Sequence, residues 1–378
     1  MKVISIGTDR KLFEEGSQVL LRNLEYAKRM EELHIVVFTT RKEKHEFKSF
    51  GNLHIYPTNS ISQWLYVLDA IFLVKNIFKS SGKNDDIVIS TQDIFQTGFV
   101  GLVISKFFEV PLQIQVHTDY LSSEFKKSFF NLVRVFIASI VVHGASRIRA
   151  VSSVVRDSIV KKYPKLADKI DILPVFISIE KIINTIPARN LGTEFPEFKF
   201  IVLMASRLEK EKNIDTAIVA FKKVLEKYPQ TGLVIAGEGS ERKNLESISS
   251  KIGINKNVRF IGWEKDLISL YKTADLFLLT SKYEGYGMTL IEAGASGCPI
   301  VTTKVGLAKT DLFVNKINSV ICETFDDICI SDAVINTIEN NQAREERKHK
   351  MQNDIRSIAL TFQDYVNLYI EYLNKTAK

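Results

Sequence analysis

The chain has 378 residues, of which 45% are apolar and 25% charged. This composition excludes a disordered or fibrous protein, and the length suggests about two globular domains. The formal net charge is +7, and residues 1–184, with 25 basic and 19 acidic side chains, contribute most of it. Three cysteines are too few for a disulfide framework and favour a reducing, cytoplasmic setting. We see no secretion signal, and no apolar stretch approaches the roughly 20 residues that span a bilayer.

Short runs of Val, Ile and Leu alternate with segments of helical periodicity, which is the pattern of a parallel sheet covered by helices on both faces. In the first half the predicted strands are Val3–Ile6, His34–Thr39, Leu53–Tyr56, Ile87–Ser90, Leu112–Val116, Ile148–Val151 and Ile170–Leu173. We expect an N-terminal Rossmann-like domain over residues 1–184. A linker is expected over 185–197, where two prolines stand among polar residues.

The same alternation occurs again in the second half. The predicted strands are Phe198–Met204, Gly232–Ala236, Val258–Ile261, Leu276–Thr280, Ile300–Thr302 and Val320–Cys322. We therefore expect an α/β fold of two doubly wound domains, the second over residues 198–358, with the active site in a shared cleft at the carboxyl ends of the strands. The helical segment over 359–378 is expected to be able to cross back to the first domain.

One segment of the first half, Phe125–Ile137, separates apolar from basic residues on a predicted helix. The apolar face consists of Phe125, Phe129, Leu132, Val133 and Phe136, and the basic residues off it are Lys126, Lys127 and Arg134. Such a helix can lie on an anionic membrane surface. The alternative is an ordinary helix packed on its own sheet. The basic residues are not interleaved with aromatic residues as in nucleic-acid-binding modules, so no nucleic-acid partner is expected.

The sharpest local feature is a glycine turn between a strand and a helix, over Ser281–Glu292. Gly285 and Gly287 permit backbone conformations that other residues avoid, so amides at the start of the helix can point at an anion. Glu284 in the turn and Glu292 in the helix can accept hydroxyl hydrogens from different parts of one ligand. The pattern predicts a phosphate seat, and a plain glycine turn with a solvated helix is the alternative.

Further candidate residues follow strands of both domains. Arg207 and Lys212 come after the first strand of the second domain, and together they can neutralise a diphosphate leaving group. His117 ends an apolar strand of the first domain, where it can hydrogen-bond a sugar or exchange a proton. Gly16, in the first strand–helix turn, can let the backbone approach a ligand. The alternatives are a solvated loop, a structural histidine and an ordinary turn glycine.

No metal or other cofactor is expected. The sequence contains no Asp-x-Asp triplet, and its aspartate pairs have no histidine or third carboxylate nearby. Gly237 and Gly239 follow a strand but lack the third glycine of a dinucleotide fingerprint, so we interpret them as a turn. No G-x-S-x-G elbow offers a serine nucleophile.

As a set, Arg207, Lys212 and the spacing from Glu284 to Glu292 resemble the retaining GT-B glycosyltransferases of family 4, also called glycosyl transferases group 1. The resemblance extends over nearly the whole chain and is strongest over residues 198–305. It implies a GT-B fold, with an acceptor-binding N-terminal and a donor-binding C-terminal domain facing across a cleft. It also implies metal-independent transfer, with retention, from a UDP- or GDP-sugar to a glycan or lipid-linked acceptor, in cell-surface polysaccharide synthesis. The enzyme would be cytoplasmic, at the inner face of the membrane.

The resemblance also implies roles for single residues. Arg207 and Lys212 would hold the donor diphosphate, Glu292 the ribose hydroxyls, and His117 would lie on the acceptor side near the sugar. Glu284 would orient the transferred sugar with backbone amides of the turn. The further implied donor contacts are Gly16, Gly262, Tyr286, Gly287, Met288 and Thr289. No covalent nucleophile is assigned.

The sequence departs from the family pattern at three places. The first loop has Gly16 between Glu15 and Ser17 in place of a double glycine, and Asn213 replaces the glycine after Lys212. The Gly-Gly-x-x-Glu stretch becomes Gly306–Asp311. A nucleotide-sugar epimerase or a phosphorylase would share the architecture, but the first should lack the glutamate spacing and the second should have a cofactor lysine. A non-catalytic relative that activates another transferase is the remaining alternative.

Overall fold

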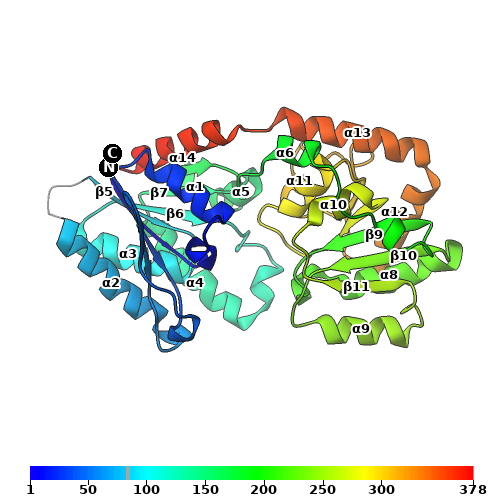
Figure 1. The fold of residues 1–378 in the computed structure, drawn as a ribbon, viewed down its shortest axis with the longest axis horizontal. Helices are drawn as coiled ribbons and strands as arrows, with labels where there is room; N and C mark the ends of the chain where they lie inside the picture. The colour runs from blue at the N-terminus through cyan, green and yellow to red at the C-terminus, as the bar shows by residue number, and fades with distance from the viewer. Residues whose placement is uncertain (82–85, 378) are drawn as a thin grey trace. The chain divides into compact units, whose positions relative to one another are not determined.

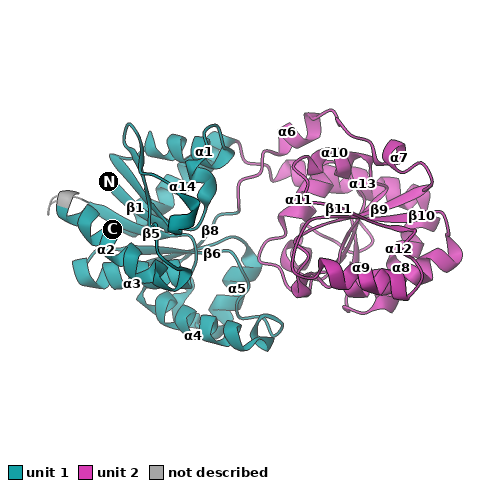
Figure 2. Ribbon diagram, turned by 60° about the horizontal axis from the view of Figure 1, so that its bottom comes forward, with its two compact units in different colours: residues 1–174, 362–378 teal, residues 175–361 magenta. Residues whose placement is uncertain are grey.

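The computed structural model describes residues 1–81 and 86–377, and its helices and strands form the ribbon in Figure 1. The chain divides into two compact units, unit 1 with residues 1–174 and 362–378 and unit 2 with residues 175–361 (Figure 2). This division differs from the expected linker over 185–197. The reason is that α6 (Ile179–Asn184) and α7 (Leu191–Glu194) bury apolar side chains in the core of unit 2.

The sheet of unit 1 has eight strands in the order β3-β4-β2-β1-β5-β6-β7-β8. Their bounds are β1 Lys2–Gly7, β2 Glu32–Val37, β3 Lys48–Phe50, β4 Leu53–Pro57, β5 Ile87–Thr91, β6 Leu112–Val116, β7 Arg147–Ala150 and β8 Ile170–Ile172. Neighbouring strands pair in parallel except β3, which is antiparallel to β4. The seven strands predicted here are confirmed, and β3 is an additional short edge strand.

Six helices of the described residues belong to unit 1. They are α1 Gln18–Ala27, α2 Tyr66–Ser81, α3 Gln96–Phe108, α4 Phe129–Gly144, α5 Ser153–Lys162 and α14 Phe362–Ala377. The chain returns to unit 1 with α14, which packs on β5 and β6 beside α1. The ring of Tyr369 on α14 stacks on that of Tyr26 on α1, with centroids 4.4 Å apart. The sheet of unit 1 is thus covered in part by a helix from the far end of the sequence.

The predicted amphipathic helix over Phe125–Ile137 is wrong at its start. A short 3₁₀ turn, Phe125–Lys127, precedes α4, and Phe125 is buried there instead of sharing the apolar face. The other apolar residues of that face are exposed, with Phe129 at 74% and Phe136 at 67%. Only the opposite side of α4, at Ala138, Val141 and Val142, is buried. The alternative prediction, an ordinary helix packed on its own sheet, does not account for this exposed apolar face.

The sheet of unit 2 has six parallel strands in the order β11-β10-β9-β12-β13-β14. Their bounds are β9 Phe200–Ala205, β10 Thr231–Ala236, β11 Val258–Gly262, β12 Leu276–Leu279, β13 Ile300–Thr303 and β14 Val320–Cys322. All six predicted strands are confirmed. The remaining helices are α8 Ile214–Lys227, α9 Arg242–Lys251, α10 Leu267–Thr273, α11 Met288–Ala295, α12 Asp327–Glu339 and α13 Asn341–Ser357.

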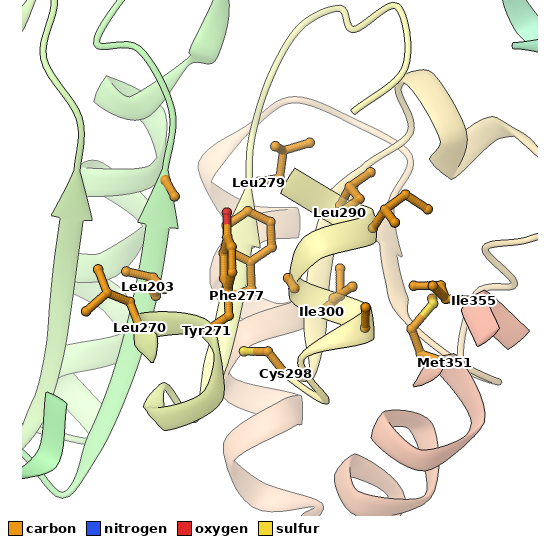
Figure 3. Close-up of a cluster of buried hydrophobic side chains, with 14 of the residues drawn as sticks. Leu203, Leu270, Tyr271, Phe277, Leu279, Leu290, Cys298, Ile300, Met351 and Ile355 are labelled. Atoms are coloured by element: carbon orange, nitrogen blue, oxygen red, sulfur yellow. The ribbon is translucent and has the colours of Figure 1, made fainter. Parts of the chain in front are cut away.

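One hydrophobic core of unit 2 fixes the position of α11. Leu290 on α11 packs into the same cluster as Met351 and Ile355 on α13, as Figure 3 shows. The two helices approach closely at Gly294, because a Cβ there would lie 2.4 Å from the Ile355 side chain. A helix held this tightly presents its N-terminus at a fixed place after β12.

Candidate active site

Two loops of unit 2 that follow neighbouring parallel strands are joined by an ion pair. β9 and β12 run side by side, and Lys212 after β9 places its Nζ 2.5 Å from Oε1 of Glu284 after β12. The Ser281 hydroxyl donates to the same carboxylate oxygen at 2.8 Å, and the Thr280 hydroxyl donates to the Lys212 carbonyl at 2.9 Å. The structure therefore brings two of the predicted site residues into direct contact.

Arg207 is presented differently from Lys212. Its side chain is 71% exposed and makes one ion pair, with NH2 3.1 Å from Oε1 of Glu211. Exposed pairs of this kind contribute about 0–1 kcal/mol. A ligand with more negative charge than one carboxylate can therefore replace Glu211 as the partner of this guanidinium with little loss of free energy.

The loop after β10, predicted as a plain turn, supports the segment that carries Arg207. Gly237 has a φ of +138° and approaches so closely that a Cβ would come within 1.9 Å of the Ser206 carbonyl oxygen. The Glu238 carbonyl accepts a hydrogen bond from the Leu208 amide at 2.9 Å. A glycine directly after a strand was the available signal, but it does not tell which neighbouring loop passes beside it.

The glycine turn ends where α11 begins. Gly287 is the N-cap of Met288–Ala295 and has a φ of +91°, a conformation that costs glycine little. The Tyr286 carbonyl accepts a hydrogen bond from the Leu307 amide at 2.9 Å, which holds the turn against the segment after β13. First-turn amides of a helix have no partner within it and lie at the positive end of its dipole. The amides up to Thr289 are thus suited to bind an anion.

Glu292 lies on α11 one turn beyond those amides. Burial raises its pKa to about 7, so near neutral pH the carboxyl exists in both protonation states. The neighbouring Tyr271 is buried, and burial followed by the negative charge of Glu292 raises the pKa of its hydroxyl. The charged form of such a partly buried carboxyl is stabilised by any ligand hydroxyl that donates a hydrogen bond to it.

Two positions at the edge of this site have left-handed backbone. Gly262, at the end of β11, has a φ of +81°, and its carbonyl accepts a hydrogen bond from the Gly237 amide at 2.6 Å. Trp263 next to it is 67% exposed. Asn213, which stands where the family has glycine, has a φ of +54°. Asparagine is among the non-glycine residues that tolerate this region, so the departure keeps the backbone conformation.

The predicted residues of the first domain lie in unit 1. His117 follows β6 directly and is exposed, with Nε2 3.3 Å from Oε1 of Gln115. Desolvation by the surrounding protein, together with the positive charges of Arg149 and Arg22, lowers the pKa of His117. Gly16 has a φ of +73° and open space around it. It precedes the residue that caps α1.

The described residues do not meet the requirements of a metal site, a disulfide or a membrane-spanning helix. Within residues 1–81 and 86–377, no group of three or more His, Cys, Asp or Glu side chains is arranged to hold a metal ion. Cys298 and Cys322 are buried, Cys329 is partly exposed, and none forms a disulfide. In the same residues, every helix is too short or too polar to cross a lipid bilayer.

Comparison with known proteins places this site in a family. Residues 192–357 match the model of the glycosyl transferases group 1. A UDP-N-acetylglucosamine–peptide N-acetylglucosaminyltransferase GtfA subunit of Streptococcus agalactiae is 36% identical over 39% of the chain and 30% of its own length. An alpha-monoglucosyldiacylglycerol synthase of Streptococcus pneumoniae is 27% identical over 57% of the chain and 51% of its own length. The chain thus spans less than two thirds of either relative.

Among solved structures, HepE of Anabaena in complex with UDP-glucose superposes with a TM-score of 0.76 at 20% identity, covering 99% of both chains. At this identity the likeness shows the fold alone, which is the GT-B type with two Rossmann-like parallel-sheet units. The family match includes every site residue of unit 2 described above. Residues 192–357, which carry these site residues, are therefore similar to the glycosyl transferases group 1 family.

Proposed function

We propose that this protein is a retaining glycosyltransferase that moves a sugar from a UDP- or GDP-sugar to a glycan or lipid-linked acceptor, in cell-surface polysaccharide synthesis. The observation that carries the proposal is the contact of Lys212 with Glu284 beside the first turn of α11. It collects a cation, a hydroxyl acceptor and backbone amides at one edge of a sheet. A sugar diphosphate needs these three kinds of group.

The leaving group of such a reaction is a nucleoside diphosphate, so its growing negative charge is what the site must stabilise. Arg207 and Lys212 would each exchange a carboxylate partner for phosphate oxygens. The amides of Tyr286, Gly287, Met288 and Thr289 would add the helix dipole. Because these groups supply the positive charge, we propose that the transfer needs no metal.

The remaining site residues would bind the neutral parts of the two substrates. Glu292 would accept the ribose hydroxyls, and Glu284, released from Lys212, would accept hydroxyls of the transferred sugar. Gly262 would border the base. In unit 1, His117 would contact the acceptor side of the sugar and Gly16 the donor. With no side chain assigned as a covalent nucleophile, attack on the face from which the diphosphate leaves would give retention.

A membrane surface is proposed as the place of reaction, on the inner face of the cell membrane. The exposed apolar side chains of α4 are Phe129, Phe130, Leu132, Val133, Phe136 and Ile140. Lys126 and Lys127 stand at the start of this helix, and no acidic residue lies within it. The Streptococcus pneumoniae relative is named for synthesis of a glycolipid, which supports a lipid acceptor.

A second candidate function is a non-catalytic partner of another transferase. The Streptococcus agalactiae relative is named as a subunit, which favours work within a complex. The two candidates differ in donor turnover. A transferase releases nucleoside diphosphate from its donor by slow hydrolysis, whereas a partner binds a donor, if at all, without releasing it.

The test is a panel of UDP- and GDP-sugars, each with EDTA, followed by thermal shift and by release of the nucleoside diphosphate. We expect one donor to stabilise the protein and to be hydrolysed slowly. Lys212→Met should abolish both effects, while Lys210→Met, an exposed lysine of the same 3₁₀ turn, should keep them. Stabilisation without release would favour the non-catalytic partner, and release that EDTA abolishes would contradict the metal-independent mechanism.

A further inference from the structure

Arg149 is a buried cation in unit 1 that has no acidic partner. It lies on β7 and is 5% exposed, and among the described residues no carboxylate lies within ion-pair distance of it. Its Nε donates to the Leu173 carbonyl at 3.3 Å and its NH2 to the Pro174 carbonyl at 3.1 Å. A buried charge held by neutral groups alone is costly for folding. This cost suggests a task beyond packing.

A third contact of Arg149 leads to His117. NH1 donates to Oε1 of Gln115 at 3.1 Å, and guanidinium nitrogens can only donate. The Gln115 side chain must therefore turn its oxygen, not its amide nitrogen, toward Arg149. The same oxygen lies 3.3 Å from Nε2 of His117. Because an amide oxygen can only accept, Nε2 must carry the proton in this contact.

Helix α14 holds the same network from the other side. The Tyr365 hydroxyl accepts a hydrogen bond from Arg149 NH2 at 2.6 Å, and the ring of Tyr369 lies 5.4 Å from the guanidinium carbon. The amide nitrogen of Gln115 donates to the Ser90 hydroxyl at 3.4 Å. Arg149 thus touches the chain where it leaves unit 1, at Pro174, and soon after it returns, at Tyr365.

We propose that Arg149 is a positioning residue that orients the Gln115 amide, and thereby fixes the His117 ring as the Nε2-protonated tautomer with Nδ1 as a hydrogen-bond acceptor. The role of His117 toward the sugar rests on the proposed function. A neutral ring in this tautomer can accept a hydrogen bond from a substrate hydroxyl at Nδ1, whereas a protonated Nδ1 would oppose the hydroxyl hydrogen. Desolvation and the positive charges of Arg149 and Arg22 favour the neutral form as well.

The direct test is the tautomer of His117 in the full chain with ¹⁵N-labelled histidine, read from the ring nitrogen shifts and assigned with His117→Gln. We expect a protonated Nε2 and an unprotonated Nδ1 in the wild type. Gln115→Met and Arg149→Met should each give a mixture of tautomers. Arg147→Met, on the same strand and bonded to the backbone carbonyl of Asp168, should leave the tautomer unchanged. A protonated Nδ1 in the wild type would overturn the proposal.

Two further variants keep the test informative if Arg149→Met folds poorly. Gln115→Glu retains the accepting oxygen and should keep the Nε2 proton, while Tyr365→Phe removes one Arg149 partner and leaves the Gln115 contact intact. A tautomer mixture in the Gln115→Glu protein, or an unchanged tautomer in the Gln115→Met protein, would contradict the mechanism.

Activity gives a second, separate readout. If His117 acts on the sugar, Gln115→Met should lower kcat about tenfold or more with little change in the KM for the donor. Gln115→Glu should recover the loss only at pH values where the ring is neutral, because the new carboxylate favours the charged ring. An inactive wild type with the expected tautomer would reject the proposed function but leave the positioning role of Arg149 standing. Full activity together with a mixed tautomer in Gln115→Met would reject the link between the two.

Discussion

The cations of the candidate site in unit 2 and the buried Arg149 of unit 1 have different kinds of partner. In unit 2, Lys212 and Arg207 each pair with a carboxylate, a partner that an incoming diphosphate can replace. In unit 1, Arg149 is bonded to carbonyl, amide and hydroxyl oxygens and is almost fully buried. The first arrangement suits cations that must change partner during a reaction, and the second suits a cation that must never move.

Removing an exchangeable cation should have the largest effect. Arg207→Ala takes away an exposed side chain whose ion pair contributes little, so folding should change by less than about 0.5 kcal/mol. Donor turnover should fall about 100-fold or more, because charge stabilisation of the leaving group is lost. Diphosphate release by the purified variant measures this. The donor turnover of Arg207→Lys should lie between that of the wild type and that of Arg207→Ala, since lysine keeps the charge but loses the paired hydrogen bonds. An unchanged rate with a confirmed donor would exclude the diphosphate role.

Replacing the Glu292 carboxyl with an uncharged amide should have opposite effects on protein stability and on donor binding. Burial raises its pKa to about 7 from 4.5, so the folded protein holds this proton to higher pH than the unfolded chain does. Its stability therefore falls as the pH rises through that interval. Glu292→Gln should remove this loss and stabilise the protein at pH 8 by about 1–3 kcal/mol, while donor affinity drops about tenfold.

Denaturant unfolding at pH 5 and pH 8 checks the sign of the Glu292→Gln effect, and donor titration checks the affinity. Glu226→Gln, an exposed residue of α8, is the matched control and should change neither. Equal stabilisation at both pH values would show that the effect does not come from the titration of Glu292.

A smaller effect is expected at the two basic residues before α4, where Lys126 is half-exposed and Lys127 pairs with Glu124. Lys126→Glu with Lys127→Glu should weaken sedimentation with anionic vesicles about fivefold or more, at roughly 1 kcal/mol per basic residue. Lys161→Glu with Lys162→Glu, at the exposed end of α5, should have a weaker effect. Equal losses in the two double variants would mean that net charge, not α4, decides the binding.

The smallest change is expected at Asn213. Asn213→Gly relieves the left-handed backbone at φ +54° but loses two side-chain hydrogen bonds, one donated to the Phe325 carbonyl and one accepted from the Thr216 hydroxyl. The relief and each lost bond amount to about 1 kcal/mol. The midpoint of thermal unfolding should therefore fall slightly, while Asn213→Ala, which keeps the strain and loses both bonds, should lower it more.

The sequence was sufficient to predict the elements whose residue pattern lies within one short segment. The apolar runs of both sheets and the glycine turn before α11 could be located from neighbouring residues alone. The edge strand β3, three residues long and half-exposed, has no such pattern. The break before α4 was missed because Ser128 interrupts a periodicity that otherwise continues.

Contacts between distant segments explain the rest of what the sequence did not predict. The partners of Arg149 come from β6, from the end of β8 and from α14, and no local pattern joins them. The same holds for Gly237, whose closeness to Ser206 follows from the pairing of β10 with β9. In contrast, Lys212 and Glu284 were predicted as one site from the resemblance of the set to a glycosyltransferase family. The structure adds the reason for their contact, because the strands that precede them are neighbours.

The return of the chain to unit 1 has a consequence for synthesis on the ribosome. Unit 2 is one continuous stretch, whereas unit 1 needs residues on both sides of it. While the chain emerges, the β-sheet of unit 1 can pair, but Arg149 has no hydroxyl from Tyr365 until α14 leaves the exit tunnel. Residues of α14 are thus the last to satisfy a charge that the nascent sheet already contains. An immature chain therefore exposes the face of β5 and β6 that α14 covers in the finished protein, together with an Arg149 side chain that lacks one of its partners.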